Sequence, residues 1–156
     1  MFIAGKQGIG YLLRERRLGG LGGDAFRDLV CRSGGPTGGA FGGAAVGAGM
    51  VFVPCKDGLT ALRVNASVPS FTVAWRAPLS ANTPVIAYGL VWTVAANPDK
   101  YRGPPWVGTL VGLDMHTGAL RAQVMLGGVP HYPSPAAVGG SLYVAGLGSV
   151  YAVNVT

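Results

Sequence analysis

Charged residues are scarce in this sequence: 12% of its 156 residues are charged, and six of them are acidic. Soluble proteins carry about 25% charged residues on average. Because solvent-facing helices need many Lys and Glu residues, this scarcity argues against an α-helical or α/β protein. The acidic residues stand singly along the chain, so catalysis by a local pair of carboxylates has no support in the sequence.

Long apolar runs are also missing, although the mean hydropathy is +0.40. The longest candidate, residues 40–54, is interrupted by four glycines, whereas a membrane-spanning helix needs about 20 apolar residues. Buried strands explain the hydropathy, and we expect no membrane span. Residues 1–5 are too few for the apolar core of a signal peptide, and no basic region precedes them. We therefore expect no signal peptide in this chain.

Basic residues outnumber acidic ones, and the formal net charge is +6. Six of the twelve basic residues fall within the first 32 positions, where Glu15, Asp24 and Asp28 are interleaved with them. A nucleic-acid site combines a basic surface with aromatic residues on which bases stack. No such aromatic platform stands among these bases, so we expect a solvated strand edge and loop, and no nucleic-acid partner.

Glycine and proline are abundant, with 27 and 11 copies, and they divide the chain into short runs. The clearest unit covers residues 83–125. It contains four β-type runs bounded by Gly, Pro or Asp, namely residues 83–87, 90–94, 108–114 and 119–125. Such runs between turn residues predict a four-stranded antiparallel meander.

This unit recurs along the chain. Small apolar residues, a glycine turn and an alternating run with one aromatic residue occur together in residues 44–53, 84–93 and 135–144. A second pattern, a glycine followed by alternating apolar residues, begins at Gly8, Gly58, Gly108 and Gly148. A repeat of roughly 40–50 residues with four strands is typical of propeller blades. Successive side chains of a blade then point to opposite neighbouring blades.

The sequence therefore predicts one all-β domain over residues 1–156, a β-propeller of four-stranded antiparallel blades. About three and a half blades are expected, which makes a partial propeller. They are a partial first blade at 1–32, a second at 42–78, a third at 83–126 and a partial fourth at 133–156. We expect the C-terminal fragment of a longer propeller. The alternative is a ring in which the first strand completes the last blade.

One segment carries a resemblance to a known family. Residues 108–118, GTLVGLDMHTG, resemble the G-x-L-x-A-L-D-x-x-T-G-K-x-x-W repeat of the pyrroloquinoline-quinone-like (PQQ-like) β-propellers. Segments 5–13, 54–58 and 131–137 are also similar to that family, so the resemblance spans most of the chain. The final Trp of the repeat docks one blade against the next. It is absent here after Gly118, and only Trp75 in the second blade is comparable.

The resemblance implies a secreted bacterial protein, extracellular or in the cell envelope. We expect a non-catalytic binding or scaffold module without a cofactor, which presents its loops and channel mouth to a protein or other ligand. The alternative is part of a PQQ- and calcium-dependent dehydrogenase of alcohols or sugars. Those enzymes have two adjacent cysteines under the cofactor, which this sequence lacks. A third hypothesis is self-association through the open strand edges of incomplete blades.

The only two cysteines, Cys31 and Cys55, fall at the ends of strands in the first and second blades. An even number of cysteines in a Gly-rich chain of secreted type predicts a disulfide. This bond would join two neighbouring blades. The alternative is a pair of buried free thiols.

Two further groups of residues are candidates for ligand binding. His131 and Tyr132 precede the last inner strand, near the channel mouth where propellers place ligands; the alternative for His131 is a structural role. The loop within the third blade carries Tyr101, Arg102 and Trp106, whose types are enriched in binding hot spots. The alternative for this loop is a rigid excursion packed on its own blade. No metal site is expected, because the potential ligands are scattered.

Overall fold

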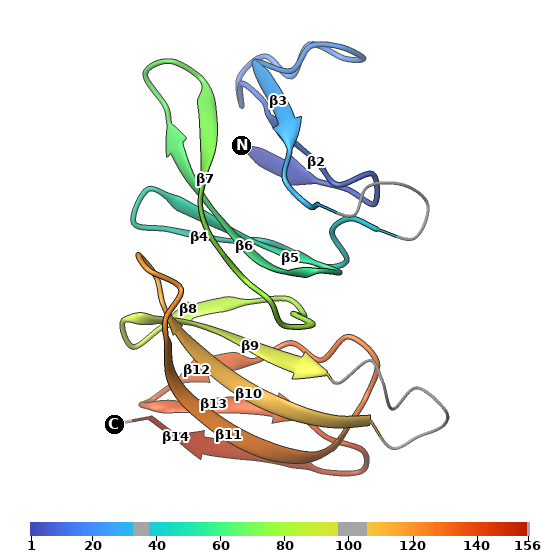
Figure 1. The fold of residues 1–156 in the computed structure, drawn as a ribbon, viewed down its shortest axis with the longest axis vertical. Coiled ribbons are helices and arrows are strands. Elements are labelled where there is room, and N and C mark those ends of the chain that lie inside the picture. The colour runs from blue at the N-terminus through green and yellow to red at the C-terminus, as the bar shows by residue number, and fades with distance from the viewer. Residues whose placement is uncertain (33–37, 97–105, 156) are drawn as a thin grey trace.

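The computed structural model describes residues 1–32, 38–96 and 106–155, and its regular elements in these ranges are β-strands (Figure 1). The strands form four separate antiparallel sheets. These ranges contain no apolar helix of membrane-spanning length. The predicted all-β fold class is therefore confirmed.

Each sheet is a meander in which strands that follow one another in the chain are paired. The first sheet contains β1 (Phe2–Ala4), β2 (Ile9–Leu12) and β3 (Phe26–Leu29). The second contains β4 (Ala45–Gly47), β5 (Met50–Cys55), β6 (Gly58–Asn65) and β7 (Ser70–Ala77). The third contains β8 (Val85–Ala87), β9 (Leu90–Ala96), β10 (Trp106–Asp114) and β11 (Leu120–Val129). The fourth contains β12 (Ala136–Val138), β13 (Ser141–Ala145) and β14 (Val150–Asn154).

The sheets are arranged as blades. The short strands β4, β8 and β12 lie next to one another at the inner side of three sheets. The sheets themselves pack face to face along the long axis of the molecule (Figure 1). Two sheets have four strands and two have three. This is the architecture of a partial β-propeller, as the repeat predicts.

Three tight hairpins explain the glycine that recurs near the start of each sequence repeat. The inner hairpins are closed by Ala48–Gly49, Tyr88–Gly89 and Gly139–Gly140, and all six residues have positive φ, between 51° and 81°. Positive φ at both central residues is the requirement of a type I′ hairpin turn, whose second position favours Gly. The recurring glycine is therefore a consequence of turn geometry.

The outer hairpin of the third sheet is longer than expected. β11 runs to Val129, although the third blade was expected to end at residue 126. Gly127 and Gly128 lie beyond that expected end and remain in the strand. The Tyr151 hydroxyl donates to the Gly128 carbonyl at 3.3 Å, and a Cβ at Gly127 would lie 2.4 Å from that hydroxyl oxygen. These glycines therefore allow the close approach of a tyrosine from the fourth sheet.

Alternation of side chains along each strand builds a separate core between each pair of neighbouring sheets. On β5, Val51 and Val53 pack in a cluster with Val30 and the first sheet. Met50 and Phe52 point the other way and pack in a cluster with Val91, Leu113 and the rest of the interface to the third sheet. Both faces of β5 are thus buried, which explains a continuous apolar run where a solvated sheet would alternate.

The fourth sheet is packed on one face. Leu142 and Val144 are buried in the core shared with the third sheet. Tyr143 lies between them and points the other way, with 38% of its surface exposed, and Val138 and Val150 are more exposed still, at 64% and 69%. Among the described residues, no sheet covers this side. Predicted self-association through such incomplete blades stays a prediction.

Trp75 contacts the third sheet from the second through a hydrogen bond and ring packing. The Trp75 indole Nε1 donates to the Met115 carbonyl at 2.9 Å, and the ring lies against Gly118, which has a φ of 73°. A Cβ at Gly118 would lie 2.6 Å from a carbon atom of that ring. Gly118 thus serves both the turn between β10 and β11 and the junction between two sheets.

Replacing Gly118 with Ala tests this junction. An alanine there must keep a left-handed φ, at about 1–2 kcal/mol, and must also displace the Trp75 ring. Gly89→Ala is the matched control, because Gly89 has a φ of 77° with open space at its Cβ position. We expect Gly118→Ala to lower the free energy of unfolding in urea by about 1–3 kcal/mol more than the control. Equal losses would show that Trp75 moves aside freely.

Candidate functional site

The segment before β4 is fixed between two sheets. The Ala40 N–H donates to the Gly5 carbonyl in the β1–β2 turn at 3.1 Å. The next N–H, of Phe41, donates to the Pro54 carbonyl on β5 at 3.2 Å. These two bonds leave the Phe41 side chain at the surface, half-buried, beside the turn of the first sheet.

An open pocket of about 370 Å³ forms where this segment meets the segment before β12. It is lined by Lys6, Ala40, Phe41, Gly42 and Tyr132, and we call these five residues the mouth pocket. The Lys6 Nζ lies 5.7 Å from the centroid of the Phe41 ring, within the range of a cation–π contact. The mouth pocket therefore combines one cation and two aromatic rings from segments that belong to three different sheets.

Tyr132 has an unusual backbone for an exposed aromatic residue. Its φ is 58°, its surface is 54% exposed, and it lies outside the inner hairpin turns, where a positive φ is required. Its ring centroid is 3.7 Å from that of His131, while Pro133 and Pro135 are buried. A left-handed backbone conformation at a bulky residue is strained, and strained residues are found more often at functional sites than elsewhere. Tyr132 is therefore an exposed residue with a strained backbone, directly followed by a buried proline.

The structure thus places both residues of the predicted channel mouth together, with Tyr132 in the pocket and the His131 ring tilted against it. Their role in binding stays a prediction. Sequence reasoning missed Lys6 and Phe41, since a lysine in a turn and a phenylalanine among glycines carry no signal of their own. Their proximity to Tyr132 comes from the packing of sheets.

The predicted partner-binding loop falls largely outside the described residues. Tyr101 and Arg102 lie in the undescribed range 97–105. Trp106 is the first residue of β10, where its backbone pairs in register with Val129; its side chain is also outside the described part. A partner-binding role for these three residues therefore stays a prediction.

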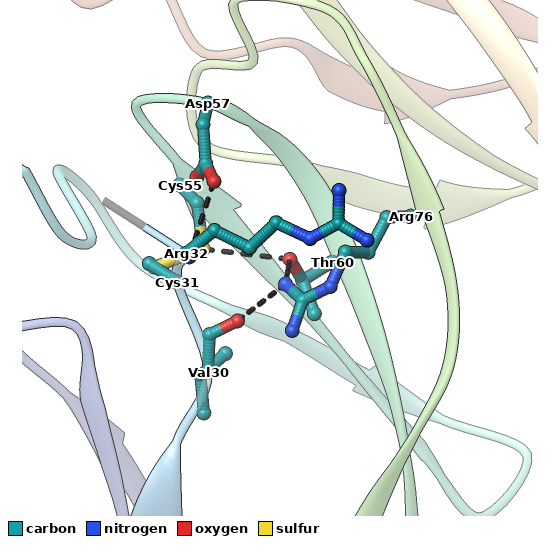
Figure 2. The surroundings of a disulfide bond; sticks show 7 residues. All are labelled: Val30, Cys31, Arg32, Cys55, Asp57, Thr60 and Arg76. Carbon is teal, nitrogen blue, oxygen red and sulfur yellow. Dashed lines mark hydrogen bonds between the residues drawn. A yellow bond between two sulfur atoms is a disulfide. The ribbon is translucent and has the colours of Figure 1, made fainter. Parts of the chain in front are cut away.

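The two cysteines form the predicted disulfide. Cys31 follows β3 and Cys55 ends β5, with Cα atoms 5.5 Å apart and both side chains fully buried (Figure 2). The alternative of two free thiols is excluded, as both sulfurs are bonded. Next to the disulfide, the backbone N–H of Arg32 donates to Asp57 Oδ2 at 3.1 Å. The disulfide joins the first sheet to the second.

The quinoprotein alternative requires calcium, and the described residues do not fit it. Among them, the group of His, Cys, Asp or Glu side chains close enough to share a metal consists of Cys31, Cys55 and Asp57. Two of the three are consumed by the disulfide. Calcium takes six to eight oxygen ligands, whereas this group offers one carboxylate. No catalytic step through PQQ and calcium can be built on these residues.

Asp114 organises the turn of the motif that resembles the PQQ-like repeat. Its Oδ1 accepts the N–H groups of His116 and Thr117, each at 3.0 Å, and its Oδ2 accepts Arg121 Nη2 at 3.2 Å. Hydrogen bonds from the Thr117 backbone and hydroxyl, and then from the other two partners, lower the pKa of Asp114 to about 2. The carboxylate is therefore structural, and the exposed His116 is part of the same turn.

Comparison with known proteins supports the fold of this chain but does not assign it to a family. No family model matches the chain, and no curated protein matches it in sequence. Among solved structures, BamB from Moraxella catarrhalis is similar, with a TM-score of 0.67 and 19% sequence identity. The match covers 99% of this chain and 42% of the BamB chain, so this chain spans less than half the length of that protein. The likeness shows the β-propeller fold.

Removing the disulfide tests how firmly it joins the first two sheets. It links residues 24 positions apart, and a cross-link closing a loop of that size stabilises a protein by roughly 3 kcal/mol in the chain-entropy account. We expect the Cys31→Ser, Cys55→Ser double variant to lose about this free energy of unfolding in urea. Reduced wild-type protein should match the double variant. Equal stability of oxidised and reduced wild-type protein would contradict the assignment.

The low pKa of Asp114 predicts a pH dependence of stability. Its folded value of about 2 lies below the ordinary 3.8, so the ionised group stabilises the folded state above about pH 4, and this contribution is lost as the pH falls towards 2. Asp114→Asn keeps an acceptor oxygen without the charge. We expect its melting temperature to fall less steeply than that of the wild type between pH 4 and pH 2. Asp28→Asn, at an exposed position on β3, should follow the wild type.

Proposed function

We propose that this chain is a non-catalytic β-propeller module that binds a protein partner at the mouth pocket. One observation carries the proposal: the strained and exposed Tyr132 stands beside Phe41 and Lys6, and the three come from different sheets. Propellers bind ligands on the loops at the ends of their blades, and Tyr is enriched in binding hot spots. A rigid aromatic surface needs little ordering when a partner docks.

The described aspartates support a non-catalytic function, because each has a structural partner. Asp24 pairs with Arg27 at 3.9 Å, and Asp28 accepts the Leu29 N–H at 2.7 Å. Asp57 and Asp114 accept backbone N–H groups at turns. A general acid or base must be available to a substrate in a pocket. We therefore assign the module no cofactor and no reaction.

We further propose that the repeat is of the PQQ-like type and that the protein works outside the cytoplasm. The first point rests on the turn built by Asp114, Thr117 and Gly118, which supplies a mechanical reason for the D-x-x-T-G motif. The second is supported by the buried disulfide, since such bonds persist in oxidising compartments such as the periplasm or the extracellular space.

Site-specific photo-crosslinking tests the function. A benzoylphenylalanine in place of Tyr132 should give a discrete covalent adduct with a partner protein in cells that produce this chain naturally. The control carries the same residue in place of Val68, which is 67% exposed in the β6–β7 turn, away from the mouth pocket. We expect an adduct at position 132 that Phe41→Ala reduces at least several-fold, and none at position 68.

Two outcomes would reject the proposal. One is the absence of any adduct at position 132. The other is a set of adducts common to both positions, which would reflect non-specific collision. Tyr132 and Val68 are exposed, so we expect both substituted chains to fold. The melting temperature of each variant checks this.

A further inference from the structure

A second pocket, separate from the mouth pocket, lies beside the disulfide. Its volume is about 350 Å³, and we call it the arginine pocket. It is lined by Arg32, Asp57, Gly58, Thr60, Arg76 and Pro78. The residues come from the end of the first sheet and from the β5–β6 turn, β6 and β7 of the second (Figure 2). The pocket therefore sits at the junction that the disulfide holds together.

Arg76 is held in place by neutral acceptors. Its Nη1 donates to the Thr60 hydroxyl at 2.8 Å and to the Val30 carbonyl of the first sheet. Thr60 is 2% exposed, and its hydroxyl also contacts the Cys55 sulfur at 3.5 Å. These contacts fix the guanidinium without neutralising it. Its remaining N–H groups make no hydrogen bond to the described protein.

Arg32 brings a second positive charge to the same place. Its side chain extends across the pocket towards Arg76 and Thr60 (Figure 2). Burial and the charge of Arg32 both lower the pKa of Arg76, and the charge of Asp57 raises it. Two guanidinium groups and one carboxylate thus line the pocket, and neither guanidinium forms an ion pair within 4 Å among the described residues. Since arginine stays protonated in proteins, the pocket keeps an excess positive charge.

We propose that the arginine pocket binds a small oxyanion group, a carboxylate or a phosphate. Guanidinium groups offer planar pairs of donors that match such groups, and charge-assisted hydrogen bonds of this kind are strong. An oxyanion between Arg32 and Arg76 would offset their mutual repulsion with two attractions. The fixed orientation of Arg76 means that little ordering is needed on binding. This site is independent of the mouth pocket and of the function proposed there.

A titration followed by amide NMR tests the proposal. Sodium phosphate and sodium succinate are added separately to the full chain, with chloride keeping the ionic strength constant. We expect saturable shifts of the amide signals of Arg32, Gly58 and Thr60 with at least one anion. The anion that saturates at the lower concentration identifies the preferred group.

Three variants make the result specific. Arg32→Gln should weaken binding roughly tenfold, the usual size for loss of a charged hydrogen-bonding partner, without a fall in melting temperature. Arg16→Gln, at an exposed position outside the pocket, should bind like the wild type. Asp57→Asn removes the competing carboxylate and should bind several-fold more tightly. Shifts that stay linear with both anions, or equal affinity of Arg32→Gln and the wild type, would overturn the proposal.

Discussion

Apolar packing between neighbouring sheets is the constraint on which the rest of this molecule depends. A meander of three or four short strands is marginal by itself, and here each sheet is stabilised by the core that it shares with the next. A strand between two such cores must be apolar on both faces, as the fully buried β5 is. This requirement explains together the scarcity of charge, the 49% hydrophobic content and the high hydropathy of a chain whose described part has no membrane-spanning helix.

The same packing decides where binding residues can lie. Side chains of the central strand β5 are committed to the cores on both faces. The two pockets are lined mainly from loops and strand ends. Tyr132, with its left-handed φ, stands directly before the buried Pro133 and outside the strands. Arg76 keeps its orientation because Thr60 and the Val30 carbonyl come from strongly packed parts of two sheets. Rigid surroundings thus orient the charge of the arginine pocket, whereas the five residues of the mouth pocket all lie outside the strands.

Much of the fold follows from local features of the sequence. The runs predicted at 90–94 and 108–114 lie within β9 and β10, and the run at 119–125 matches the start of β11 to within one residue. These runs were predictable because alternation and hairpin glycines are properties of a few neighbouring residues. The extension of β11 through Gly127 and Gly128 could not be seen in this way. These two glycines contact the hydroxyl of Tyr151, which belongs to another sheet. Nothing nearby in the sequence distinguishes them from turn residues. The disulfide could be predicted from the sequence because two cysteines allow only one pairing.

The binding residues were harder to predict, yet the architecture supplies a rule for finding them. Several hydrogen bonds that join neighbouring sheets span about one repeat: 40 positions for Trp75 to Met115, 46 for Arg76 to Val30 and 52 for Gly140 to Tyr88. The disulfide and the hydrogen bond from Tyr151 to Gly128 also join neighbouring sheets and span 24 and 23 positions. Residues bonded across these junctions are thus no more than about one repeat apart. Phe41 and Tyr132 are about two repeats apart and still share a pocket, so that pocket joins segments of sheets that are not neighbours in the chain. Sequence separation in a radial fold therefore distinguishes a junction site from a mouth site.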